Sequence, residues 1–134
     1  MNTQPASEKS QVVVRAEHSY KGQSATAVVK VWTAPGRPAG HQQLAGSRAW
    51  LALGQEFLKH QDPEAAIYCA RAGLAELGDD YTDPQTVDDT GMKLLAAQER
   101  IKKGFAADGA TVMLRMLETR TKLYAKLHAA EVAE

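Results

Sequence analysis

The sequence predicts a mainly α-helical protein, in which four helices form antiparallel hairpins behind an N-terminal β-hairpin arm. Three features of the sequence indicate this fold class. Apolar residues recur at helical spacing from residue 43 onward, Asp-Pro pairs at 62–63 and 83–84 mark helix starts, and residues 12–20 alternate with a period of two. The chain has 134 residues, of which 44% are hydrophobic, and this is enough for one domain with its own core.

The N-terminal part of the chain predicts a flexible tail at 1–10 and a β-hairpin arm at 11–32. Two β-prone runs flank a turn that contains Gly22. The first run places Val12, Val14, Ala16, His18 and Tyr20 on one face. A short helix capped by Ser24 is the alternative. Because an isolated hairpin is marginally stable in water, we expect the arm to pack on another element or to pair with another chain.

A linker at 33–42 separates the arm from the helical domain, 43–134. Two prolines and two glycines fall within the eight residues TAPGRPAG, which cannot continue a helix or a central strand. From this point the pattern is helical to the end of the chain.

The first two helices are predicted back to back. The first begins within 43–47 and ends near His60. Asp62 then serves as the N-cap of the second helix and Pro63 occupies its first position, because a side-chain oxygen and a fixed φ suit a helix start. Gly78 ends the second helix. A joint this short forces the two helices into an antiparallel hairpin.

Two further helices complete the predicted domain. The third begins at Asp83-Pro84 and stops at Gly104, and Asp108 caps the fourth. Their inward-facing residues are predicted to be Val87, Leu94, Leu95, Gln98 and Ile101 in the third helix, and Val112, Met116, Leu117, Leu123, Tyr124 and Leu127 in the fourth. Because the fourth helix is the longer, part of its apolar stripe needs a further cover.

The unit at 47–78 combines large apolar residues with small ones around its joint, namely Trp50, Leu53, Gly54, Phe57, Asp62 and Ala66. With these residues it resembles a tetratricopeptide repeat, and 83–127 resembles one more loosely. Small residues at Gly54 and Ala66 let two helices approach, while large rings fill the space beside the crossing. The resemblance implies a repeat-like stack of hairpins, and a plain antiparallel bundle is the alternative.

The resemblance also implies a binding face, because such repeats hold extended peptides or partner helices on the surface lined by their first helices. In this sequence the corresponding residues are Arg48, Leu51, Gln55, Leu58 and Lys59. Their mixture of cations, amide and leucine suits a peptide with an acidic group. The alternative is an ordinary solvated helix face.

The charges are balanced overall, with a formal net charge of zero, but they are unevenly distributed. An acidic segment at 76–89 precedes a basic stretch that follows residue 100. The basic surface of the last two helices comprises Lys102, Lys103, Arg115, Lys122 and Lys126. This layout favours an acidic protein partner or a second copy, while nucleic acid is a weaker candidate because few aromatic residues accompany the cations.

The sequence shows no motif for catalysis, a cofactor or a metal. None of the four histidines has a metal-ligand spacing to another ligand, and Cys69 has no base near it in sequence. Neither a secretory signal nor a membrane-spanning apolar run is visible. We therefore expect a cytoplasmic, non-enzymatic protein–protein interaction module, acting as an adaptor, chaperone-like binder or assembly factor, that self-associates.

Overall fold

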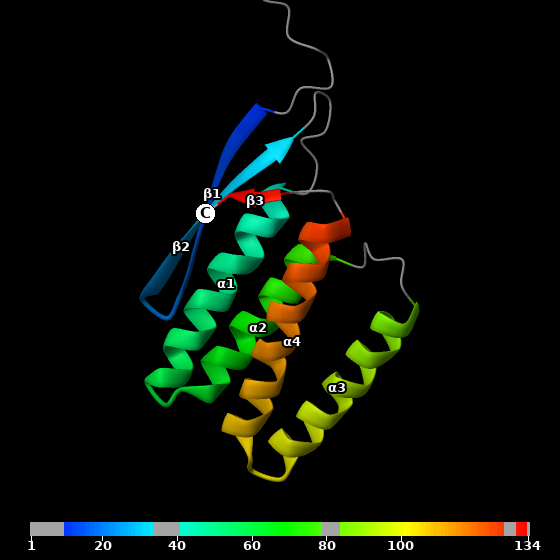
Figure 1. Ribbon diagram of the computed structural model, residues 1–134. Helices are drawn as coiled ribbons and strands as arrows, with labels where there is room; N and C mark the ends of the chain where they lie inside the picture. The colour runs from blue at the N-terminus through cyan, green and yellow to red at the C-terminus, as the bar shows by residue number, and fades with distance from the viewer. Residues whose placement is uncertain (1–9, 34–40, 79–83, 128–130, 134) are drawn as a thin grey trace, which may run out of the picture.

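The computed structural model describes residues 10–33, 41–78, 84–127 and 131–133. Four helices and an N-terminal β-hairpin confirm the predicted fold class. The strands are β1 (Ser10–Tyr20), β2 (Gln23–Thr33) and β3 (Glu131–Ala133). The helices are α1 (His41–Lys59), α2 (Pro63–Leu77), α3 (Pro84–Lys102) and α4 (Ala106–Leu127). Figure 1 shows the hairpin lying against α1, with α3 on the opposite side of the molecule.

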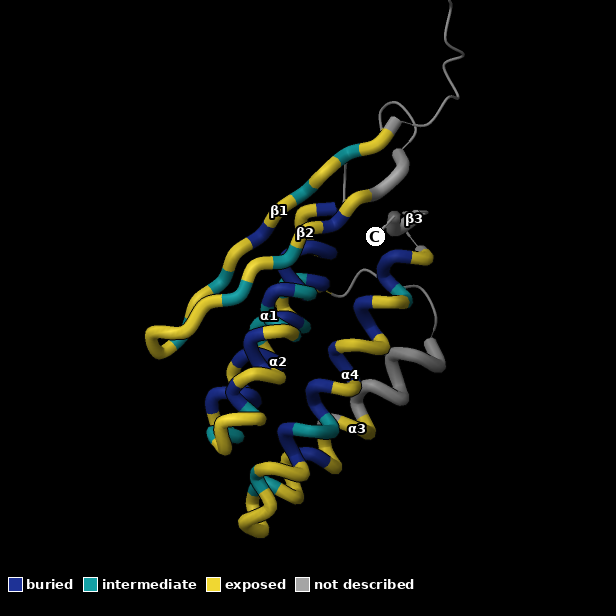
Figure 2. Tube along the Cα trace, turned by 60° about the vertical axis from the view of Figure 1, so that its left-hand side comes forward, coloured by how far each residue is buried: buried dark blue, intermediate teal, exposed yellow. Residues whose placement is uncertain are grey.

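The β-hairpin turns at Lys21-Gly22, where both residues have positive φ angles of 51° and 80°. Such a two-residue turn matches the right-handed twist of the flanking strands. The strands pair without interruption from Tyr20↔Gln23 to Ser10↔Thr33. The inward face packs on α1 and buries Ala16 and Val29, so the arm is covered by its own chain (Figure 2).

The C-terminal end differs from the sequence expectation of continued helix. Helix α4 ends at Leu127, and β3 pairs antiparallel with β2, which gives the sheet order β1-β2-β3. A strand of three residues is too short to show an alternating pattern, so its existence depends on the β2 edge that it meets. The N-terminal hairpin and residues 131–133 therefore share one sheet.

Helices α1 and α2 form the predicted antiparallel hairpin. The Asp62 side chain accepts a hydrogen bond from the Ala65 backbone N–H at 3.2 Å, and Pro63 is the first helical residue. Gly78 follows α2 with a φ of 68°, a conformation that glycine adopts without steric cost. These observations confirm the cap, the proline position and the stop.

Helix α3 packs chiefly against α4, and some of the predicted details of this pair are wrong. Helix α4 begins at Ala106, so Asp108 lies in its first turn and is not its cap. Leu95 and Gln98 are exposed, because the face of α3 that meets α4 carries Ala97 and Ile101. The predicted Asp83 cap lies outside the described residues, as do the side chains of Val87, Leu94 and Leu127.

The core lies where α1, α2 and α4 meet and continues beneath the sheet. On α4, Met116, Leu117 and Tyr124 are buried as predicted. Val112 and Leu123 are half-buried. The α4 stripe also buries Arg120, which stands between Leu117 and Leu123 in the sequence, and residues that the prediction missed, namely Ala110, Met113, Leu114, Thr121 and Ala125. The Thr121 hydroxyl donates to Ser47 Oγ at 3.2 Å, which joins α4 to α1 inside the core. Toward the C-terminal end of α4, Tyr124 and Ala125 share a core cluster with Ala16 and Val29 of the sheet.

Gly54 marks the point of closest approach between α1 and its neighbours. A Cβ atom placed there would lie 2.7 Å from Leu114 Cδ2 and 3.2 Å from Cys69 Cβ. We predict that Gly54→Val lowers the free energy of unfolding by about 1–3 kcal/mol, because overpacking a filled core forces neighbours to shift. Ala52→Val is the matched control, since Ala52 is exposed on the same helix and should cost less than about 1 kcal/mol. Equal losses in urea titrations of both variants would contradict the close packing.

Candidate functional site

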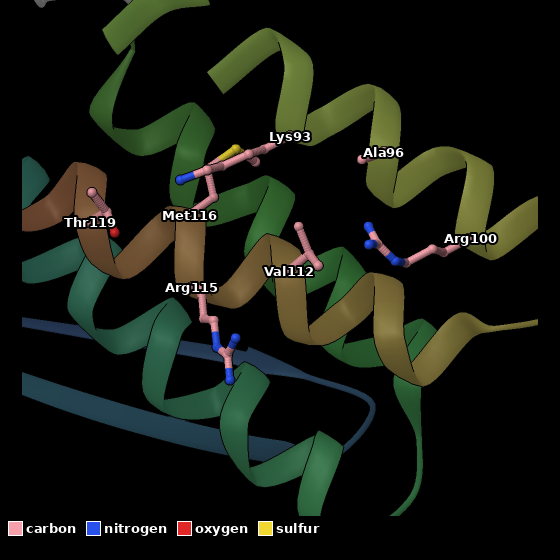
Figure 3. Close-up of a pocket in the computed structure, with 7 residues that line it drawn as sticks. All are labelled: Lys93, Ala96, Arg100, Val112, Arg115, Met116 and Thr119. Atoms are coloured by element: carbon pink, nitrogen blue, oxygen red, sulfur yellow. The ribbon is translucent and has the colours of Figure 1, made fainter. Parts of the chain in front are cut away.

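A groove of about 370 Å³ lies between α3 and α4. Its volume falls within the range of ligand pockets, roughly 300–1,000 Å³. The lining residues are Lys93, Ala96 and Arg100 from α3, and Val112, Arg115, Met116 and Thr119 from α4. Figure 3 shows Val112 and Met116 pointing from α4 toward α3, while Lys93 and Arg100 extend from α3 over the gap. The groove thus has an apolar floor beneath two cations.

The groove exists because the two helices touch near their connecting turn and separate beyond it. At Gly109 an added Cβ would lie 2.7 Å from Ile101 Cγ1 and 3.0 Å from the Ala97 carbonyl oxygen, so close contact there needs a residue without a side chain. Gly104, with a φ of 90°, turns the chain between the helices. Figure 1 shows α3 and α4 diverging from this turn. Side chains therefore fill the narrow end and leave the wider part open.

The electrostatic character of the groove is positive. Its lining includes Lys93, Arg100 and Arg115 and no carboxylate. Among the residues that the structure describes, these three cations have no carboxylate within ion-pair distance. The Arg115 side chain points away from α3, so Lys93 and Arg100 dominate the groove itself (Figure 3). Because Lys93 and Arg100 are seven residues apart on α3, about 10 Å along the helix, two separate anionic groups over the apolar floor would be needed to pair with both.

The five residues of the predicted α1 binding face differ in their exposure. Leu51 and Leu58 are half-buried against the core, and Arg48 is half-buried as well. Gln55 and Lys59 are exposed, and the Lys59 ammonium lies 4.0 Å from the Glu56 carboxylate on the same helix. The two leucines pack against the core and keep part of their surface in solvent. The most exposed residues of this face, Gln55 and Lys59, are polar.

The five residues of the predicted basic surface are all exposed, but they are dispersed. Lys102 and Lys103 lie at the C-terminal end of α3, and Lys126 lies at the far end of α4. Helix α4 has 22 residues, so its two ends are roughly 30 Å apart. Lys122 and Arg115 lie between them, and the exposed Glu118 interrupts the series. Arg115 is the one member of this set that also lines the groove.

An aromatic cluster fastens the hairpin to α1 and α2. The His18 ring stacks on Trp50 with centroids 4.4 Å apart, and Tyr20 stacks on Tyr68 at 4.0 Å. His18 Nε2 also lies 2.8 Å from a Glu76 carboxylate oxygen. That oxygen would be 2.9 Å from a Cβ added at Gly46, so Glu76 reaches β1 across a residue without a side chain. These contacts connect three elements and explain why the arm does not stand alone.

Sequence reasoning missed most of the groove residues, although a signal was present. Lys93, Ala96 and Arg100 are spaced by three and four residues on one helix, and Val112, Met116 and Thr119 follow the same spacing on the next. The groove requires these faces to oppose each other without complete closure. Helical spacing places residues on a face and does not report how far apart two faces lie.

The described residues contain no cluster of the kind that holds a metal ion. Nowhere in the described ranges do three His, Cys, Asp or Glu side chains gather closely enough to hold a metal ion. Of the acidic segment, Glu76 has a described side chain, and it lies beside His18. No helix in the described ranges is both long enough and apolar enough to cross a membrane.

Comparisons with protein-family models, curated proteins and solved structures find no match to this chain. The tetratricopeptide resemblance therefore remains a prediction, carried by the residues around the α1–α2 crossing.

The Cys69 thiol is buried beneath α1, and burial raises its pKa from 9.0 to about 11, with a smaller contribution from Asp62. We predict that iodoacetamide alkylates Cys69 in the native protein at pH 8 roughly a hundredfold more slowly than in denaturant, because the thiolate is the reactive form. Mass spectrometry over time measures both rates. Equal alkylation rates in the native and denatured protein would contradict the burial.

The raised pKa of Cys69 also makes the stability depend on pH. Because the thiol of the unfolded protein ionises at a lower pH than the thiol of the native protein, the free energy of unfolding should fall as the pH rises from 9 to 11.

Proposed function

We propose that this protein is a non-enzymatic interaction module that binds an acidic, amphipathic segment of a partner protein in the groove between α3 and α4. The observation that carries the proposal is the combination of an apolar floor, Val112 and Met116, with Lys93 and Arg100 above it. Apolar side chains of the partner would enter the groove, and its carboxylates would pair with the two cations. An adaptor or assembly factor needs a site of this kind.

The surroundings of the groove favour a polypeptide over a small ligand. Met92 and Leu95 on α3 are 68% and 62% exposed, and Phe105 beside the α3–α4 turn is 57% exposed. Exposed apolar residues close to a pocket are typical of a protein-binding surface. The groove also runs between two helices of 19 and 22 residues, a shape that suits an extended or helical segment. A cytoplasmic location is part of the same proposal.

The proposal predicts a preference for negative charge in the bound peptide. We expect a fluorescein-labelled amphipathic peptide of leucine and glutamate to bind, and its counterpart with lysine in place of glutamate to bind at least tenfold more weakly, as measured by fluorescence anisotropy. The Lys93→Glu/Arg100→Glu variant should lose the preference. Equal affinity for the two peptides, or binding of neither, would contradict the proposal.

The matched control is Lys59→Glu/Arg71→Glu, which makes the same change in net charge at exposed positions on α1 and α2. This variant should bind the acidic peptide with unchanged affinity. Because Lys59 belongs to the predicted α1 face, a loss of binding here and not in the groove variant would assign the site to α1 instead.

The second candidate function is that of a nucleic-acid-associated accessory protein, and the exposed Lys102, Lys103, Lys122 and Lys126 favour it. Its signature is an affinity for labelled single-stranded RNA or duplex DNA that falls steeply as salt rises. If the groove proposal is correct, the Lys93→Glu/Arg100→Glu variant changes peptide binding and leaves any residual nucleic-acid binding nearly unchanged, since the four lysines lie outside the groove.

A further inference from the structure

Strand β1 forms an open edge of the sheet. Within the described ranges, the order β1-β2-β3 leaves one side of β1 unpaired along its 11 residues, and on the other side of the sheet β3 pairs with Lys30–Trp32 of β2. Figure 2 shows β1 at the margin of the molecule, with no described element beyond it. An open edge of this length presents a row of backbone donors and acceptors that another strand can use. One of these acceptors, the Arg15 carbonyl oxygen, lies 3.5 Å from the Nε2 donor of Gln42 on α1, a long contact that an incoming strand would replace.

The hairpin register fixes which backbone groups face the open edge. Tyr20 and Gln23 flank a two-residue turn and therefore form a hydrogen-bonded pair, and such pairs alternate along an antiparallel ladder. Tyr20, His18 and Ala16 accordingly direct their backbone groups toward β2. The residues between them direct theirs outward, and these are Ser19, Glu17, Arg15, Val13 and Gln11.

This alternation limits how a second copy of β1 can pair antiparallel with the first, because hydrogen-bonded partners must both come from the outward set. A register centred on Arg15 would place two exposed arginines opposite each other, which is unfavourable. A register centred on Ala16 pairs Arg15 with Glu17 of the second copy and, by symmetry, Glu17 with its Arg15. The edge is therefore complementary in charge to itself.

The side chains on both faces are consistent with the Ala16-centred register. Arg15 and Glu17 are exposed on the outer face. One carboxylate oxygen of Glu17 accepts a hydrogen bond from Thr26 of β2 at 3.2 Å, and its other oxygen is the one that would pair with Arg15 of the second copy. On the inner face the small Ala16 would meet its own counterpart. Val14 is half-buried at the edge, and it would be covered by the adjoining strand.

We propose that two copies of this chain associate through antiparallel pairing of their β1 strands, centred on Ala16, to form one continuous sheet with two reciprocal Arg15–Glu17 pairs. The association is independent of the α3–α4 groove, which lies on the opposite side of the helical layer from the hairpin (Figure 1). Each copy keeps its groove, so the dimer would present two binding sites.

Sedimentation velocity on the full chain over a range of concentrations tests the proposal through charge exchange. The unaltered protein should dimerise reversibly. Glu17→Arg and Arg15→Glu should each raise the dissociation constant roughly tenfold or more, because each places like charges opposite one another. The double variant Arg15→Glu/Glu17→Arg should restore it to within roughly threefold, and so should an equimolar mixture of the two single variants.

The matched control is Glu99→Arg, which makes the same charge change at an exposed position on α3 and should leave the dissociation constant unchanged. Far-UV circular dichroism verifies that each variant keeps its secondary structure. A protein that stays monomeric up to roughly 1 mM would overturn the proposal. The proposal would also be overturned if neither single variant changed the dissociation constant of the dimer. It would be overturned as well if the single variants weakened the dimer and neither the double variant nor the mixture restored it.

Discussion

The structure depends on how closely α1, α2 and α4 approach at their shared crossing. A Cβ atom added at Gly54 of α1 would clash with Leu114 of α4, and a Cβ atom added at Gly73 of α2 would clash with Leu117 of α4. Removing side-chain bulk at these positions lets large residues of the third helix fill the space, which is how a core reaches close packing. Because α1 is held in this way, it can serve as the platform on which the hairpin lies.

The aromatic contacts extend this platform to the sheet. Trp50 of α1 lies beside Gly73 of α2, where an added Cβ atom would be 3.2 Å from the Trp50 Cβ. The Trp50 ring stacks on the His18 ring of β1. Tyr68 of α2 stacks on Tyr20 near the end of the same strand. A two-stranded hairpin is marginal alone, so these rings supply the apolar burial that it lacks. The arm is thus part of the folded unit, and its exposed surfaces are its outer face and the β1 edge.

The two candidate interaction surfaces arise from elements that the core leaves incompletely covered. Helix α3 meets the rest of the molecule mainly along α4, and the close contact of Ala97 with Gly109 lies toward the end near the turn. Strand β1 has a neighbour on one side only among the described elements. Each surface also carries charges that match a particular occupant: cations over an apolar floor in the groove, and an Arg–Glu alternation along the strand.

The sequence by itself determined the local structure. The cap at Asp62, the stop at Gly78, the turn at Gly22 and the alternation along β1 are all short-range effects of φ preference, hydrogen bonding and periodicity, and they appear as predicted. Tertiary structure decided which faces meet. Leu51 and Leu58 lie against the core and Leu95 lies in solvent, because burial depends on the neighbouring helix and not on residue type. The groove between Lys93 and Met116, the third strand and the open β1 edge depend likewise on contacts between segments far apart in the chain, which helical and strand periods do not encode.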